Sequence, residues 1–166
     1  MDILKDPKIT ALTMAVTPHV VSGDVYGSYV LEKNGEYLCE IPPKQLMDKG
    51  CRYFGSSLKG RLDGTREVFG ITRKAPISLD PMSGIFFLPT TSPHSSDCIW
   101  IAHGHVHSLE KLESKQTRIH FEGGKELTVD SSFTSLTNQI QRTAQFRHLM
   151  LDRITKHQRE VELASS

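Results

Sequence analysis

The spacing of apolar residues divides the chain into two parts. Up to about residue 130, short apolar runs alternate with turn residues, which predicts β-structure. Asn34-Gly35 between the strand-like stretches 25–31 and 36–41 is a strong signal for a two-residue hairpin. A second hairpin is expected within residues 117–129, around Gly123-Gly124. The other predicted strands cover residues 10–16, 67–72, 77–79, 85–88 and 98–107.

Helical periodicity appears in two places. Residues 44–49 follow Pro42-Pro43 and precede Gly50, which predicts a short helix. From Ser132 onward the apolar residues fall on one stripe of a helical wheel, which predicts an amphipathic helix over about residues 132–157. Ser131 or Ser132 would cap this helix, and residues 161–166 would form a short frayed tail. The predicted stripe contains Phe133, Leu136, Ile140, Ala144, Leu151 and Ile154.

These elements predict one α+β domain over residues 1–160, with a mostly antiparallel sheet within residues 1–130 and a long C-terminal helix. The chain has 166 residues, of which 37% are hydrophobic and 23% charged, as is usual for a soluble globular protein. No apolar run approaches the length of a membrane span, and the N-terminus has no signal-peptide pattern. Three widely spaced cysteines favour reduced thiols in a cytoplasmic protein over a disulfide framework.

The net charge of +1 conceals an uneven distribution of charge. Residues 44–74 hold eight basic and three acidic residues, and residues 131–166 hold five basic and three acidic residues. The segments 1–43 and 75–130 each carry a net charge of −3. A protein that binds nucleic acid needs one basic face, not a basic whole, so this distribution permits nucleic-acid binding.

The basic segment 51–68 has the chemistry of a phosphate-binding site. Its arginines and lysine supply charge, its glycines allow close approach of the backbone, and its hydroxyl groups are short donors. Arginine on a flexible loop also suits the electronegative minor groove of A-tract DNA. So many glycines disfavour a recognition helix. The alternative to a binding site is a solvated loop with scattered charge. Within the same segment, Tyr53 or Phe54 would insert between base steps if DNA is bound, although packing in the core is the more common role for such a residue.

The C-terminal helix offers a second candidate surface. Arg142 and Arg153 are expected on the face opposite the apolar stripe, where they would contact phosphate or simply be solvated. Phe146 and Leu149 lie outside the predicted stripe, which marks them as candidates for contact between subunits.

A row of histidines provides the main enzyme alternative. If residues 98–107 form one strand, then His103, His105 and His107 share a face, and two of them at i and i+2 can ligate zinc. No third ligand accompanies them. Such histidines more often lie on a half-exposed face of a sheet, bonded to water or to neighbouring residues. Motifs for nucleotide binding and for serine nucleophiles are absent. We therefore expect no enzyme, cofactor or metal, with a hydrolase built on His103 and His105 as the alternative.

The basic segment and the stretches that follow it resemble one known family. Residues 51–68, Lys74–Pro81, Ile85–Thr90, Cys98–Val106 and Asn138–Ala144 together resemble the ComK family of bacterial competence transcription factors, in the same order over about residues 50–150. The resemblance implies a cytoplasmic, nucleoid-associated activator of the genes for DNA uptake. Such a protein would bind paired A-tract and T-tract promoter boxes through the minor groove as a dimer or higher oligomer.

The resemblance and the residue chemistry together define the expected contacts with double-stranded DNA. The candidates are Arg52, Lys59, Arg61 and Arg66, then Arg73, Lys74 and Arg142, with Ser56, Ser57 and Thr65 as donors to phosphate. RNA polymerase and an adaptor–protease system are further partners that the resemblance implies. Family members often extend beyond the position of Ser166, with a tail used in activation and degradation, so DNA binding is the property expected to carry over most directly.

Overall fold

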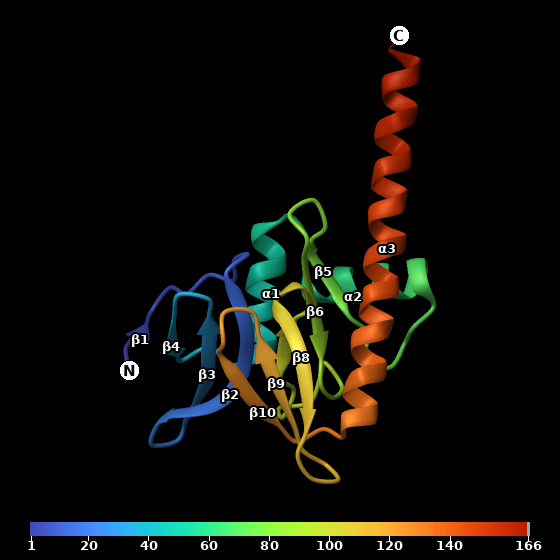
Figure 1. Ribbon diagram of the computed structural model, residues 1–166. Coiled ribbons are helices and arrows are strands. Elements are labelled where there is room, and N and C mark those ends of the chain that lie inside the picture. The colour runs from blue at the N-terminus through green and yellow to red at the C-terminus, as the bar shows by residue number, and fades with distance from the viewer. Residues whose placement is uncertain (166) are drawn as a thin grey trace.

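A seven-stranded sheet runs through the molecule, and helices and a smaller sheet cover its two faces (Figure 1). The computed structural model describes residues 1–165. The strand order is β1-β4-β3-β2-β7-β6-β5, and within these residues only the contact between β1 and β4 is parallel. This arrangement confirms the predicted α+β class with a mostly antiparallel sheet. The strands are β1 (Ile3–Leu4), β2 (Thr13–Ser22), β3 (Val25–Glu32), β4 (Gly35–Cys39), β5 (Ile77–Asp80), β6 (Ile85–Pro89) and β7 (Trp100–Ala102).

Both predicted hairpins are present. Glu32 pairs with Gly35, so Lys33 and Asn34 form the tight turn between β3 and β4. The second hairpin belongs to the three-stranded sheet β10-β9-β8, and its turn contains Gly123 and Gly124 at φ 87° and 93°. Positive φ is readily adopted by glycine alone, so this turn depends on both residues. The strands of the small sheet are β8 (Val106–Lys111), β9 (Thr117–Phe121) and β10 (Glu126–Val129).

The helical content exceeds the prediction. Helix α1 (Pro43–Tyr53) includes the predicted helix 44–49 but continues through Gly50. Helix α2 (Leu58–Phe69) occupies most of the basic glycine-rich segment, and its last residues replace the strand that was predicted over 67–72. Gly70, at φ 71°, ends α2 in the left-handed conformation that glycine adopts without strain. Helix α3 (Phe133–Ala164) is the long C-terminal helix.

The central sheet is buried on both faces. Phe87 of β6 points to a core that contains Leu46 and Leu58, from α1 and α2. Its neighbour Leu88 points the other way, to a core that contains Phe121 of the small sheet and Leu136 of α3. Strands covered on both sides need apolar residues at consecutive positions, which explains the continuous apolar run of β6.

The face that helix α3 turns to the body overlaps the predicted stripe only in part, at Leu136 and Ile140. Its buried residues are Leu136, Gln139, Thr143 and Phe146, whereas the predicted stripe residues Ala144 and Leu151 are exposed. The prediction failed because two of the buried residues are polar and therefore do not register as an apolar stripe. The helix also continues to Ala164, beyond the predicted end near residue 157, and Ser166 lies outside the described residues.

Phe146 belongs to the core and is not a contact residue between subunits. Its side chain is 1% exposed, and its ring packs edge-on against Phe86, with 5.8 Å between the centroids. The ring of Phe69 of α2 also contacts it, with 6.2 Å between the centroids. The predicted role of Phe146 at an interface is therefore wrong, and the neighbouring candidate Leu149 is half-buried.

The buried Gln139 joins α3 to two other parts of the molecule. Its side-chain amide donates hydrogen bonds to the carbonyl oxygens of Lys74 and of Pro89, the latter at 3.2 Å. Its own oxygen accepts a bond from Arg142 at 3.1 Å. Because the residue is 4% exposed, water cannot replace these bonds.

We expect Gln139→Leu to lower the free energy of unfolding by about 1–3 kcal/mol, because it leaves buried carbonyl groups without donors. Chemical denaturation followed by circular dichroism measures this change. Gln145→Leu, on the exposed side of the same helix, is the matched control and should change stability by less than about 0.5 kcal/mol. Equal effects of the two substitutions would contradict the assigned role of Gln139.

Candidate nucleic-acid interface

Helices α1 and α2 are held together at the start of the basic segment by one carboxylate. Asp48 Oδ1 accepts a hydrogen bond from the backbone N–H of Leu58 at 2.8 Å, and Oδ2 accepts one from Arg52 Nε at 2.8 Å. The bond from Arg52, helped by the one from Leu58, lowers the pKa of Asp48. Asp48 therefore remains charged and positions the first turn of α2 near neutral pH.

The glycine-rich segment is helical because local bonds outweigh its weak helix propensity. Ser57 caps α2, and its hydroxyl accepts a bond from the backbone N–H of Gly60 at 3.0 Å. Gly60 packs closely on the cap, since a Cβ atom there would lie 2.9 Å from Ser56 Oγ. The prediction of a flexible loop across this segment is wrong, and it failed because the cap and the bond from Asp48 depend on the folded arrangement.

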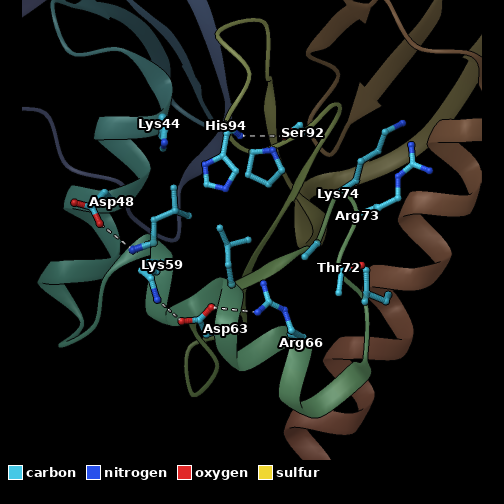
Figure 2. Close-up of a pocket in the computed structure, with 15 residues that line it drawn as sticks. Lys44, Asp48, Lys59, Asp63, Arg66, Thr72, Arg73, Lys74, Ser92 and His94 are labelled. Atoms are coloured by element: carbon cyan, nitrogen blue, oxygen red, sulfur yellow. Dashed lines mark hydrogen bonds and ion pairs between the residues drawn. The ribbon is translucent and has the colours of Figure 1, made fainter.

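A groove of about 640 Å³ lies between α2 and two loops, over residues 71–75 and 92–94 (Figure 2). Basic side chains from three separate segments line it, from α1, α2 and the loop that follows α2. Leu58, Leu62, Ile71 and Ala75 contribute apolar lining. The groove therefore combines positive charge with an apolar wall. Its charged and titratable members are Lys44, Asp48, Lys59, Asp63, Arg66, Arg73, Lys74 and His94.

Most of the positive charge in this basic groove is not neutralised. Asp63 contacts Lys59 at 2.9 Å and Arg66 at 3.9 Å, and Lys59 nevertheless remains 87% exposed. In the described part of the chain, no carboxylate lies within ion-pair distance of Lys44, Arg73 or Lys74. Five cations face two carboxylates, so the groove favours an anionic ligand.

The loop that carries Arg73 and Lys74 is fixed by α3. Lys74 has φ 49°, a left-handed conformation that costs a residue other than glycine about 1–3 kcal/mol. The Lys74 carbonyl accepts the bond from Gln139, and the Arg73 carbonyl accepts one from Arg142 Nη2 at 2.9 Å. These bonds hold the strained loop and leave the side chain of Arg73 exposed.

Two of the predicted DNA contacts are structural residues instead. Arg61 Nη2 donates to the carbonyl oxygen of Leu79 at 3.2 Å, and its Nε is buried against the sheet. Thr65 is 1% exposed, and its hydroxyl donates to the carbonyl oxygen of Pro76 at 2.6 Å. Both residues face β5 because α2 packs on it, which a linear reading of a loop does not reveal.

The remaining predicted contacts separate into two groups. Lys59, Arg66, Arg73 and Lys74 line the groove. Arg52 lies at a different cavity, beside Tyr53, and Arg142 supports the 73–74 loop from behind. Partial burial lowers the pKa of Arg142, although the guanidinium stays charged at neutral pH. Ser56 and Ser57 are half-buried at the α2 cap and are not among the residues that line the groove.

The histidine row does not form the face that a metal site would need. After β7 the chain enters a single 3-10 turn at His103–His105, so the alternation expected for one strand over 98–107 is broken. His103 Nε2 lies 3.2 Å from the carbonyl oxygen of Ile140, and Nδ1 lies 3.1 Å from Arg147. Burial and the Arg147 guanidinium both lower the pKa of His103, which favours the neutral ring.

These contacts contradict the hydrolase alternative. Both ring nitrogens of His103 are already bonded, and His105 Nε2 lies 2.6 Å from the carbonyl oxygen of Ala11. Within residues 1–165, no group of three or more His, Cys, Asp and Glu side chains is arranged to hold a metal ion. None of the described helices is both long and apolar enough to cross a membrane.

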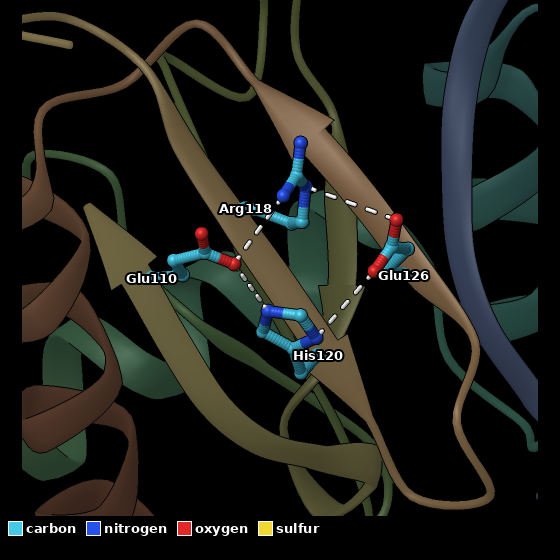
Figure 3. A network of polar contacts seen from close by, with 4 residues as sticks. All are labelled: Glu110, Arg118, His120 and Glu126. Carbon is cyan, nitrogen blue, oxygen red and sulfur yellow. Dashed lines mark hydrogen bonds and ion pairs between the residues drawn. The ribbon is translucent and has the colours of Figure 1, made fainter. Parts of the chain in front are cut away.

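The small sheet presents a polar face of another kind (Figure 3). His120 lies between two carboxylates, with Nε2 2.8 Å from Glu110 and Nδ1 3.6 Å from Glu126. Arg118 contacts the same two carboxylates, at 3.3 and 3.8 Å. The two carboxylates outnumber the one guanidinium, so this face lacks the uncompensated positive charge of the groove.

Comparison with known proteins identifies the family of this chain. A family model described as ComK protein matches residues 5–155. The competence transcription factor of Bacillus subtilis (strain 168) is 38% identical over 151 residues, which cover 91% of this chain and 78% of the relative. The chain belongs to the ComK family. No solved structure matches it at a significant level.

For this member of the ComK family, the structure adds two groove residues that the sequence reading did not select. Lys44 and His94 lie in the groove although 50 residues separate them. Lys44 belongs to the segment of highest positive charge, which was a usable signal. His94 lies in a polar loop far along the chain, and no sequence feature connected it with α2.

The structural assignment predicts how variants of this ComK-family protein differ in stability. Arg61→Ala and Thr65→Val should each lower the free energy of unfolding by about 1–3 kcal/mol, because each removes a partner of a carbonyl group in or beside β5. Lys59→Ala, on the exposed face of the same helix, should change it by less than about 0.5 kcal/mol. Urea unfolding measures all three, and an unaffected Arg61→Ala variant would return Arg61 to the list of ligand contacts.

Proposed function

We propose that this protein is a competence transcription factor that binds double-stranded DNA in the basic groove and activates genes for DNA uptake. The observation that carries the proposal is the groove itself, where five cations from separate segments meet two carboxylates. Membership of the ComK family and the name of the Bacillus subtilis relative support this function.

The two sides of the groove suit different parts of a duplex. Lys59 and Arg66 stand on the exposed side of α2, where they can contact successive phosphates. Phosphate contacts fix the position of a protein on DNA, and they release counterions when they form. Lys44 at the start of α1 extends the same basic surface.

The 71–75 loop is the proposed reader of A-tract and T-tract promoter boxes. A minor groove about 6 Å wide admits an arginine on a loop more easily than a helix. Narrow A-tract grooves concentrate negative potential, and an inserted guanidinium gains most there. The exposed Arg73 meets this requirement because its backbone is held by α3 while its side chain is free.

The protein would act with several partners. Paired boxes on DNA favour symmetric binding by two or more copies. RNA polymerase would be contacted during activation, and an adaptor–protease system would limit the amount of the protein. We propose that it acts at the nucleoid, in the cytoplasm.

Gel-shift titration tests the DNA target. We expect tighter binding to a duplex with spaced A-tract and T-tract boxes than to a GC-rich duplex of equal length, and competition by a minor-groove ligand. Affinity should fall steeply with salt because bound phosphates release counterions. Equal affinity for the two duplexes, or resistance to the minor-groove ligand, would contradict readout through the minor groove.

Single substitutions separate readout from phosphate contact. Arg73→Ala should weaken binding to the A-tract duplex by about 1–3 kcal/mol and binding to the GC-rich duplex by less. Lys44→Ala should weaken both equally and reduce the slope of log K against log salt by about one. Lys115→Ala, between β8 and β9 and away from the groove, is the control that should leave both affinities nearly unchanged. An Arg73→Ala variant with full preference for A-tract DNA would remove this loop from the proposed interface.

A further inference from the structure

The outer half of α3 projects beyond the rest of the protein as a single helix (Figure 1). Phe146 is the last buried residue of α3, and between Leu151 and Ala164 only Ile154 is even half-buried. A lone helix of fewer than about 15 residues is only marginally stable in water. Its apolar residues are also left in solvent, with Val161 65% and Leu163 71% exposed.

The pattern that packs α3 against the body continues along this projection. Thr143 is fully buried, and Arg147 lies over the ring of Phe86 at 5.0 Å, so both face the body. Met150 follows Thr143 by one heptad, and Ile154 follows Arg147 by one heptad. Residues one heptad apart remain on nearly the same side of a helix. The next positions of the two series are His157 and Val161, so the projection carries a seam of Met150, Ile154, His157 and Val161.

This seam has the spacing of a short coiled coil. Its residues alternate by four, three and four positions, as the core positions of two paired helices do. The seam spans residues 150–161, about 18 Å of helix. Arg153 and Glu160 flank it on one side, also one heptad apart.

The charges of Arg153 and Glu160 beside the seam are complementary to those of a second copy of the same segment. When two copies of residues 150–161 run antiparallel, Met150 faces Val161 and Ile154 faces His157 across the pair. The same register brings Arg153 of each copy beside Glu160 of the other, which makes two opposite-charge contacts. A parallel register places Arg153 beside Gln158 and Glu160 beside Ser165, with no charge complementarity.

The flanking residues are available for these contacts. Arg153 is exposed and has no carboxylate partner within the described residues. Glu160 touches only the exposed ring of its neighbour His157, at 3.6 Å, in the part of the helix that the structure describes. We propose that residues 150–161 of α3 pair antiparallel with the same segment of a second copy of the protein.

This pairing deepens the proposed self-association on DNA, since it names the contact between copies, but it rests on α3 alone. Two heptads form a weak dimer, and neighbouring copies on one duplex would pair more readily because their effective concentration is high. The test is therefore made without DNA, so that failure of the pairing and failure of DNA binding are separate results.

Sedimentation velocity over a wide concentration series measures the monomer–dimer equilibrium. We expect the unmodified protein to move from monomer to dimer as concentration rises. Arg153→Glu alone and Glu160→Arg alone should each weaken the dimer about tenfold, because each turns two attractive contacts into repulsive ones. The double variant Arg153→Glu with Glu160→Arg should restore the dimer, since the opposite charges have only exchanged places.

Two further variants control for charge and for the seam. Arg159→Glu makes the same charge change on the side opposite the seam and should leave the dimer unchanged. Ile154→Glu places a charge in the seam and should give monomer at every concentration. Unfolding of the body of this variant, followed by circular dichroism, should be the same as in the unmodified protein. A monomeric unmodified protein would overturn the proposal. A dimer that responds to Ile154→Glu but not to the charge reversals would overturn the antiparallel register.

Discussion

The buried amide of Gln139 is the contact on which the position of the basic loop depends. It binds the carbonyl groups of Lys74 and Pro89 and accepts a bond from Arg142, so one side chain joins α3, the loop and the central sheet. Lys74 holds a left-handed backbone angle that is unfavourable by itself. The bonds from α3 offset this cost, and they keep the side chains of the loop at the edge of the groove instead of against the body.

The groove also has an electrostatic cost. Five cations close together repel one another, and the two carboxylates at the groove relieve only part of that repulsion. Asp48 and Asp63 do so while they also organise the helices, because Asp48 joins α1 to α2 and Asp63 spans one turn of α2. A surface that remains repulsive in the free protein has most to gain when an anion binds. Arg61 and Arg142 donate hydrogen bonds inside the structure, whereas four of the five groove cations are exposed.

The sequence predicted the parts of the fold that local chemistry determines. Both hairpins followed from turn residues, although the first turn is Lys33-Asn34, one residue before the predicted Asn34-Gly35. The continuous apolar run of β6 identified a strand. Helix α2 was missed because its stability comes from a cap and from the Asp48 carboxylate, which lies ten residues before Leu58. Four of the predicted contacts line the groove, whereas Arg61 and Thr65 are turned to β5 by packing that no local pattern encodes. The face of α3 was partly misjudged because the buried residues Gln139 and Thr143 are polar and do not register as an apolar stripe.

Hydrogen exchange with and without an A-tract duplex tests most directly whether the basic groove is the DNA-binding surface. Amides in the first turns of α2, in the 71–75 loop and in the 92–94 loop should exchange more slowly when DNA is bound, because the duplex covers them. The outer face of the small sheet, around Glu110 and His120, should exchange at the same rate in both states. Slower exchange confined to the small sheet, with the groove unchanged, would contradict the account.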